Sequence, residues 1–210
     1  MQLQLPRPPA KRIWTSIVRR KIENQASCLQ LAGIQGSDYL LSFVNKVRSG
    51  DTGNLEGVAA AWYFPRLFGS GFTRSQQRLV NSALNYGYAI LRGAIARGLV
   101  AHGLLPSLGI FHSSEQNAFN LADDVIEPFR PVIDLIVAGM AYRDTDDLTP
   151  EDKAMLVNAL NIDIDMPRGR MSVLSAIEQC IESLVRAYEP EHDTPLELPR
   201  LCGLEIHDMG

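Results

Sequence analysis

Residues 79–102, LVNSALNYGYAILRGAIARGLVAH, form the longest helical pattern in this chain of 210 residues and decide its fold class. Leu84, Gly87, Ala94 and Gly98 recur at separations of three, seven and four residues, which places them near one face of a helix. Small residues on such a face let a neighbouring backbone approach closely. The pattern therefore predicts a central, mostly buried helix with other helices packed around it.

Further helical patterns lie on both sides of this segment. Apolar residues at three- and four-residue steps predict an amphipathic helix from about Trp14 to Leu31, closed by Gly33, and a last helix over 172–188. Thr149, followed by Pro150 and two acidic residues, is a strong helix start. Other helices are expected near 37–44, over 115–128 and over 131–142. One more helix should begin after an N-cap at Asn54, and Pro65 should kink or shorten it.

Strand patterns are scarce in comparison. Residues 162–166 alternate between apolar and acidic side chains, which predicts a possible short β-hairpin over 162–170. The fold class that follows is all-α, with one multi-helix domain over residues 12–188. Residues 1–11 are interpreted as an N-terminal extension or linker, and residues 189–210 as an acidic, proline-rich tail.

Composition favours a folded protein that acts away from membranes. Hydrophobic residues make up 46% of the chain and charged residues 21%, which is ordinary for a globular domain. No apolar run reaches the roughly 18 residues that span a bilayer, and the first twelve residues lack the apolar segment of a signal peptide. A cytoplasmic location is expected. Cys28, Cys180 and Cys202 are odd in number and widely spaced, so they indicate neither a disulfide framework nor a structural zinc site.

The net charge of −4 conceals a strong asymmetry along the chain. Residues 1–104 carry 13 Lys or Arg against 4 Asp or Glu, whereas residues 144–210 carry 5 against 15. A basic half joined to an acidic end is typical of a surface that binds a polyanion, although two solvated faces would give the same count. Nucleic acid is therefore a candidate partner.

The segment 111–131 places one imidazole and three carboxylates around a predicted turn and helix: His112, Asp123, Asp124 and Glu127. Asp123 and Glu127 lie four residues apart and share a helix face, where carboxylates repel unless a cation joins them. A capping histidine and a solvated helix face would explain the same residues. Glu127 is followed by Pro-Phe-Arg-Pro in an apolar surrounding, which favours an inward face, and buried charges need partners. Two carboxylates and one imidazole would suit Mg²⁺ or Mn²⁺.

Three blocks of sequence also resemble a known family. Residues 54–60 (NLEGVAA), 84–91 (LNYGYAIL) and 109–131 are similar to signature segments of the CRISPR-associated spacer integrase, the larger subunit of the adaptation complex. The likeness is strongest to the variant that accompanies type II, single-effector systems. Residues 14–25 fit the same pattern, and the resemblance covers most of the stretch from about 12 to 188.

The resemblance implies an α-helical catalytic domain with a divalent cation, Mg²⁺ or Mn²⁺. Its ligands would be Glu56, His112 and Glu127, the last in preference to Asp123 or Asp124, and Tyr86 would lie near the scissile phosphate. Members of this family ordinarily begin with a β-rich domain that helps to form a dimer, and this sequence is interpreted as lacking that domain. The Asp-Pro pair often seen before the long helix is also missing from residues 73–81.

The implied function is spacer integration, in which a DNA 3′-hydroxyl attacks a phosphodiester of the repeat array. The implied partners are double-stranded and branched DNA, a second copy of the chain as a homodimer, and a small second subunit, with no membrane. Two alternatives stay open: a non-catalytic helical DNA-binding adaptor, and an unrelated metal-dependent phosphoesterase. Backbone contacts to DNA would come from the basic residues Arg19, Arg20, Lys21, Arg66, Arg74, Arg78, Arg92 and Arg97.

Overall fold

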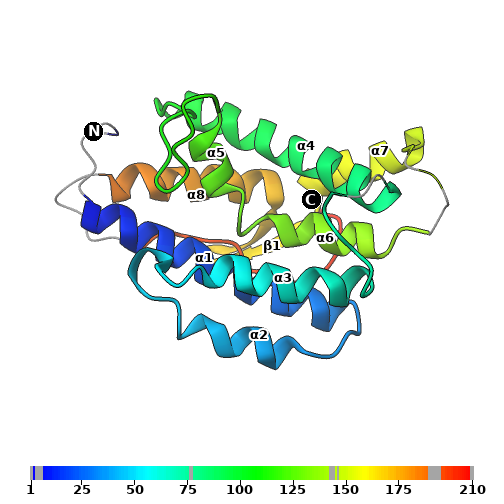
Figure 1. The fold of residues 1–210 in the computed structure, drawn as a ribbon. Coiled ribbons are helices and arrows are strands. Elements are labelled where there is room, and N and C mark those ends of the chain that lie inside the picture. Colours follow the sequence, from blue (N-terminus) through cyan, green and yellow to red (C-terminus); the bar gives the residue numbers. More distant parts are fainter. Residues whose placement is uncertain are drawn as a thin grey trace.

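The computed structural model of the chain describes residues 2, 7–75, 78–141, 145, 147–188 and 195–208. The fold is built mainly of helices (Figure 1). The described residues also form one two-stranded sheet, a short antiparallel hairpin. The prediction of an all-α domain with a small hairpin is confirmed. No helix within these described ranges is long and apolar enough to cross a membrane.

The first half of the chain forms the helices α1 (Arg7–Leu31), α2 (Ser37–Val44) and α3 (Leu55–Phe68), with a 3₁₀ turn η2 at Ser49–Asp51. At 25 residues α1 is longer than α4, because it begins at Arg7 rather than near Trp14. Prolines at positions 8 and 9 are compatible with this early start. The backbone N–H that proline lacks would have no acceptor within the helix in its first turn. The predicted extension therefore overlaps a helix, and its residues 1 and 3–6 lie outside the described part.

The start of α3 differs from the prediction in one useful detail. Asn54 occupies the N-cap position with a φ of 49°, but its side chain caps nothing. The carboxylate of Asp51 accepts the backbone N–H groups of Leu55 and Glu56 instead, both at 2.9 Å. This capping fixes the backbone of Glu56 at the first turn. Pro65 lies inside the helix, which continues to Phe68.

Helix α4 (Leu79–Ala101) packs against α5 (Asn120–Val125), α6 (Arg130–Ala138) and α8 (Val173–Ala187), as the sequence predicts for a central helix. Figure 1 shows α6 between α4 on one side and the α1–α3 pair on the other. A Cβ atom on Gly87 would lie 2.5 Å from a methyl group of Ile133, and one on Gly98 would lie 2.7 Å from Ile181. These glycines therefore allow the close helix contacts that their spacing predicts.

The prediction of one helix over 115–128 is wrong, because only Asn120–Val125 is α-helical. The preceding residues form a loop that polar side chains hold in place. The amide oxygen of Asn117 accepts the N–H of Phe119 at 3.0 Å, and the Asn120 side chain donates to the carbonyls of Ser107 and Ser114. Such local bonds offer the backbone an alternative to helix. Helix α6 ends at Ala138, and position 142 of the predicted helix lies outside the described residues.

The last third contains α7 (Pro150–Val157), the 3₁₀ turn η3 (Asn158–Asn161), the strands β1 (Asp163–Met166) and β2 (Gly169–Ser172), and α8. Thr149 and Asp152 form the predicted capping box at the start of α7.

Residues 195–208 do not behave as the predicted tail, because they pack back onto the helices. Leu198 and Leu201 are buried, and Asn24 of α1 bonds to the carbonyl of Pro199 and the N–H of Leu201. The rest of that segment, 189–194 and 209–210, lies outside the described part.

Candidate metal and DNA site

Three charged side chains from distant parts of the sequence meet between α1, α3 and the turn before α6. The ammonium group of Lys21 forms ion pairs with Oε1 of Glu56 and with Oε2 of Glu127. Lys21 and Glu127 are almost fully buried, whereas the Glu56 side chain keeps 29% of its surface exposed. The predicted convergence of Glu56 and Glu127 is therefore present, and a protein cation lies between them.

Glu127 has a second cationic partner. The Nε of Arg130 donates to its Oε1 at 2.9 Å, so each carboxylate oxygen faces a positive group. Burial alone would raise the pKa of Glu127, but Lys21 and Arg130 outweigh burial and lower this pKa to about 2. Burial likewise opposes the charge on Lys21, and the two carboxylates reverse this effect and raise its pKa. The formal charges of Lys21, Arg130, Glu56 and Glu127 sum to zero.

His112 is held by Asp124 rather than by the other carboxylates. Its Nδ1 lies 2.7 Å from Oδ1 of Asp124, and because a carboxylate only accepts, Nδ1 carries the proton. Asp124 is fully buried and also accepts the backbone N–H groups of Ile110, Phe111 and His112 at 2.5–3.2 Å. The hydrogen bond to Asp124 is the main reason why the pKa of His112 is raised.

Aromatic packing holds the loop that carries His112 against α1. The ring of Phe111 stacks on Trp14, with centroids 4.3 Å apart and planes 3° from parallel. The His112 ring meets the edge of Trp14 at 5.9 Å. The loop is thereby attached to the helix that carries Lys21, seven residues beyond Trp14.

Of the three predicted ligands, Glu56 and Glu127 meet at Lys21, whereas His112 is held by Asp124. The charge of Glu127 contributes to the raised pKa of His112, after the hydrogen bond and the charge of Asp124. Within the described part of the chain, no three His, Cys, Asp or Glu side chains are grouped closely enough to hold a metal.

The donors themselves fit a divalent cation. Two carboxylates already surround a positive charge, and a carboxylate on Nδ1 leaves Nε2 as the free imidazole donor, the usual arrangement of a metal-binding histidine.

Lys21, one of the basic residues expected to contact the DNA backbone, lies on the buried face of α1. Its spacing from Trp14 and Ile17 places it on the buried side, where only 6% of its surface is exposed. Arg19 and Arg20 do lie nearer the surface, where Arg19 donates to the carbonyl of Val47 at 3.0 Å and Arg20 pairs with Glu23 at 2.7 Å.

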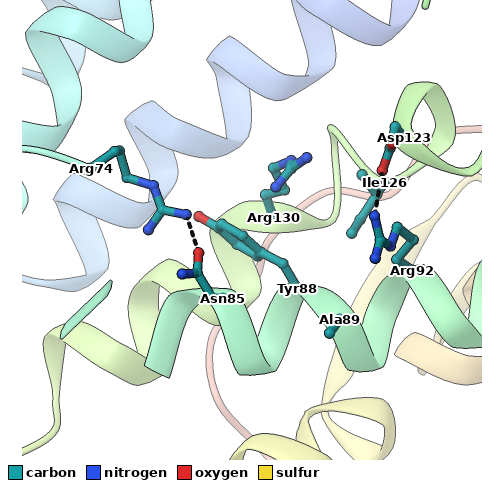
Figure 2. Close-up of a pocket in the computed structure, with 8 residues that line it drawn as sticks. All are labelled: Arg74, Asn85, Tyr88, Ala89, Arg92, Asp123, Ile126 and Arg130. Carbon is teal, nitrogen blue, oxygen red and sulfur yellow. Dashed lines mark hydrogen bonds and ion pairs between the residues drawn. The ribbon is translucent and has the colours of Figure 1, made fainter. Parts of the chain in front are cut away.

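A basic pocket of about 280 Å³ lies beside this centre, between α4 and the turn before α6 (Figure 2). Arg74 reaches it from the loop before α4 and donates to Asn85 at 2.7 Å. Arg92 pairs loosely with Asp123 at 3.8 Å. The pocket is lined by Arg74, Asn85, Tyr88, Ala89, Arg92, Asp123, Ile126 and Arg130.

Tyr88 connects the pocket to a buried polar network. The guanidinium of Arg130 lies over its ring at 4.5 Å, and its hydroxyl donates to Asp134. Tyr63 donates to the other oxygen of Asp134 at 3.0 Å. Burial raises the pKa of Asp134 to about 6 despite these two hydroxyl partners. Arg130 therefore joins two environments, with its Nε on Glu127 and its face on Tyr88.

The other predicted residues are more scattered. Tyr86 is half-buried against the core, and Tyr88, two residues further along α4, lines the pocket in its place. Arg66 lies over the ring of Trp62 at 3.6 Å, while Arg78 and Arg97 are exposed. The place of Tyr86 near the scissile phosphate and the DNA contacts of these arginines stay predictions.

Sequence reasoning missed three residues: Lys21 as a buried partner, Asp124 as the support of His112, and Tyr88. One signal was present, because Lys21 follows Trp14 and Ile17 at helical steps on the apolar face, where a charge needs a partner.

Comparisons with known proteins show the family and the fold of the chain. Residues 2–159 match the family described as CRISPR associated protein Cas1. The CRISPR-associated endonuclease Cas1 of Neisseria meningitidis serogroup C (strain 8013) is 44% identical over 208 residues, an alignment that covers 98% of this chain and 68% of that relative.

Two solved structures share the fold. A partial Cas6-RT-Cas1–Cas2 complex matches with a TM-score of 0.73 at 20% identity, covering 94% of this chain and 71% of that one. A casposase bound to integration product matches with a TM-score of 0.71 at 19% identity, covering 88% of this chain and 62% of that one.

Proposed function

The chain belongs to the family of CRISPR-associated protein Cas1, and from that premise we propose that it is a divalent-metal-dependent DNA endonuclease and integrase of CRISPR adaptation. Its reaction is a transesterification. The 3′-hydroxyl of a short DNA fragment attacks a phosphodiester at the edge of a repeat, a new phosphorus–oxygen bond forms, and the displaced strand leaves with a free hydroxyl. Water in place of that hydroxyl gives a nick.

The observations that support this proposal are the meeting of Glu56 and Glu127 around a positive charge and a histidine whose Nδ1 is fixed by Asp124. We propose that these two carboxylates and Nε2 of His112 hold Mg²⁺ or Mn²⁺. When bound, such an ion activates the attacking oxygen and stabilises charge on the phosphate. Tyr86 remains the proposed tyrosine near the scissile phosphate, as the family resemblance implies.

The surrounding residues orient these groups and bind the substrate. Asp124 fixes the imidazole of His112, and Arg130 holds one oxygen of Glu127 while its face rests on Tyr88. Arg74 and Arg92 line the adjacent pocket, where two guanidinium groups suit phosphate oxygens of the DNA backbone. Backbone contacts of this kind position DNA without reading its sequence.

The proposed partners are double-stranded and branched DNA, a second copy of this chain, and a small second subunit. The basic residues of the first half support the DNA partner. Two solved structures of similar fold, a complex that contains Cas1 and Cas2 and a casposase bound to integration product, support the second subunit and the integration reaction. A cytoplasmic location stays part of the proposal.

The direct test is cleavage of a branched DNA substrate with and without Mn²⁺, comparing the wild-type chain with His112→Ala. We expect activity that needs Mn²⁺ and is lost in the variant. His102→Ala is the matched control, because His102 is exposed at the end of α4 and its Nδ1 bonds to the carbonyl of Gly98 in its own helix. Equal cleavage by all three proteins would overturn the proposed function.

One observation favours the adaptor alternative: the carboxylates of Glu56 and Glu127 are already neutralised by Lys21 and Arg130, as they would be in a purely structural cluster. An adaptor would keep its DNA affinity in Glu56→Ala, His112→Ala and Glu127→Ala and show no Mn²⁺-dependent thermal shift. Activity on a nucleoside monophosphate with none on branched DNA would favour the phosphoesterase instead.

A further inference from the structure

The ammonium group of Lys21 occupies the space between the two carboxylates that are proposed to bind the metal. It contacts Oε1 of Glu56 and Oε2 of Glu127, and Arg130 holds the remaining oxygen of Glu127. Glu127 therefore has no oxygen that is free of a protein cation. A metal ion placed between the two carboxylates would take the position that this ammonium group holds.

The charge balance of these side chains also indicates that the ammonium group and a metal ion exclude each other. The formal charges of Lys21, Arg130, Glu56 and Glu127 sum to zero, and Lys21 and Glu127 are almost fully buried. A divalent cation added to this group would leave a net charge of +2 in a poorly solvated place, with an ammonium in contact with the same carboxylates. Like charges this close repel each other strongly where bulk water does not screen them. The ammonium and the metal therefore compete for one position.

Of the two resident cations, Lys21 is the one suited to move. Its charge is carried on a flexible four-carbon chain with rotatable donors, whereas Arg130 is fixed by the hydrogen bond to Glu127 and by its stacking on Tyr88. The Glu56 side of the contact is open, because that side chain keeps 29% of its surface exposed. An ammonium that leaves Glu127 has a route toward solvent past Glu56.

We propose that Lys21 is a resident cation that holds Glu56 and Glu127 together before metal binds, and that the metal must displace its ammonium group to enter. This inference rests on the proposed function, since it needs the same carboxylates to be ligands. Its consequence is that Lys21 stabilises the metal-free chain and lowers its affinity for divalent ions. The DNA-free protein would then bind metal weakly although its carboxylates are already in place.

The test is a Mn²⁺ titration of the full chain without DNA, followed by electron paramagnetic resonance of free Mn²⁺. Lys21→Met removes the ammonium and keeps most of the volume. We expect the Kd for Mn²⁺ to fall by about tenfold or more. The metal-free variant should melt at a lower temperature than wild type, and saturating Mn²⁺ should raise its Tm by more.

Two further variants keep the test decisive. Lys21→Gln removes the charge but leaves one hydrogen-bond donor, so it answers the question if Lys21→Met does not fold. Lys153→Met removes a lysine charge at an exposed position of α7 and should leave both the Kd and the Tm shift at the wild-type values. Combining Lys21→Gln with His112→Ala should abolish the gained affinity.

The outcomes separate this inference from the proposed function. Wild-type binding that is lost in His112→Ala, together with unchanged or weaker binding in both Lys21 variants, would show that Lys21 supports the site and does not compete with metal. No binding by wild type or by any Lys21 variant would overturn both proposals. Binding that appears only once Lys21 is replaced would support both.

Discussion

Nδ1 of His112 lies 2.7 Å from the carboxylate of Asp124, a residue that also accepts three backbone N–H groups of the loop carrying that histidine. One buried carboxylate thus fixes both the position of the loop and the orientation of the imidazole. The neighbouring acids have different partners, because Asp123 pairs with Arg92 and Glu127 with Lys21 and Arg130.

Asp124→Asn should weaken Mn²⁺ binding and cleavage by about 10- to 100-fold, the usual effect of losing the support of a metal-binding histidine. The Asn side chain keeps the size of Asp, but its amide nitrogen cannot accept hydrogen bonds as the second carboxylate oxygen does. The imidazole should therefore lose its fixed orientation. Mn²⁺ affinity and cleavage of branched DNA measure the effect. The control Asp38→Asn, at an exposed position of α2, should match wild type. Wild-type behaviour of Asp124→Asn would contradict the role given to Asp124.

Gly87→Ala should destabilise the fold by about 1–3 kcal/mol, the usual cost of overpacking. The added methyl group would lie 2.5 Å from Ile133, so α4 and α6 would have to move apart. Gly93→Ala is the matched control on the same helix, because its Cβ would meet no atom within 4 Å. That control should stabilise α4 by roughly 0.5–1 kcal/mol. Urea unfolding measures both, and equal effects of the two variants would show that α4 and α6 are not in close contact.

The pH dependence of stability should change in Asp134→Asn. Burial raises the pKa of Asp134 to about 6, above the ordinary value, so the folded state holds this proton more tightly than the unfolded state. Its contribution to stability is therefore fully present near pH 4 and is lost as the pH rises through 6.

The difference in unfolding free energy between wild type and Asp134→Asn should accordingly grow in favour of wild type as the pH falls from 7 to 4. Urea unfolding at several pH values measures this difference. A constant difference over the range would mean that Asp134 titrates as an ordinary carboxyl group.

Arg92→Ala should weaken DNA binding about equally for different sequences and reduce the slope of log affinity against log salt by about one, if its guanidinium contacts a phosphate. Fluorescence anisotropy with two unrelated duplexes at several salt concentrations measures both quantities. Arg168→Ala removes an exposed arginine beside the β1–β2 hairpin and serves as control. An unchanged salt slope in Arg92→Ala would exclude Arg92 from the DNA surface.

The parts of the fold that follow from local sequence patterns are predictable from the sequence. The glycine spacing in α4, the capping box at Thr149 and the alternation over 162–166 each act within a few residues, and the structure agrees with them. The helix expected over 115–128 fails because Asn117 and Asn120 bond to nearby backbone groups, a competition that apolar spacing does not reveal.

The candidate site is less predictable because its contacts join distant segments. Lys21 and Glu127 are 106 positions apart in the chain, so no local pattern could pair them. The family resemblance singled out Glu56, His112 and Glu127, but not the cation between two of them. The identity of Asp124 as the partner of His112 needed the loop geometry, since Asp123 and Asp124 are adjacent and equally acidic in sequence.

The central claim is that His112 shares one cation with Glu56 and Glu127. Pulsed electron paramagnetic resonance of the Mn²⁺-loaded chain tests it most directly, because an imidazole ligand gives a nitrogen coupling to the metal. We expect this coupling to be present in wild type, absent in His112→Ala and unchanged in His102→Ala. A bound Mn²⁺ without nitrogen coupling in wild type, or with the same coupling in His112→Ala, would contradict it.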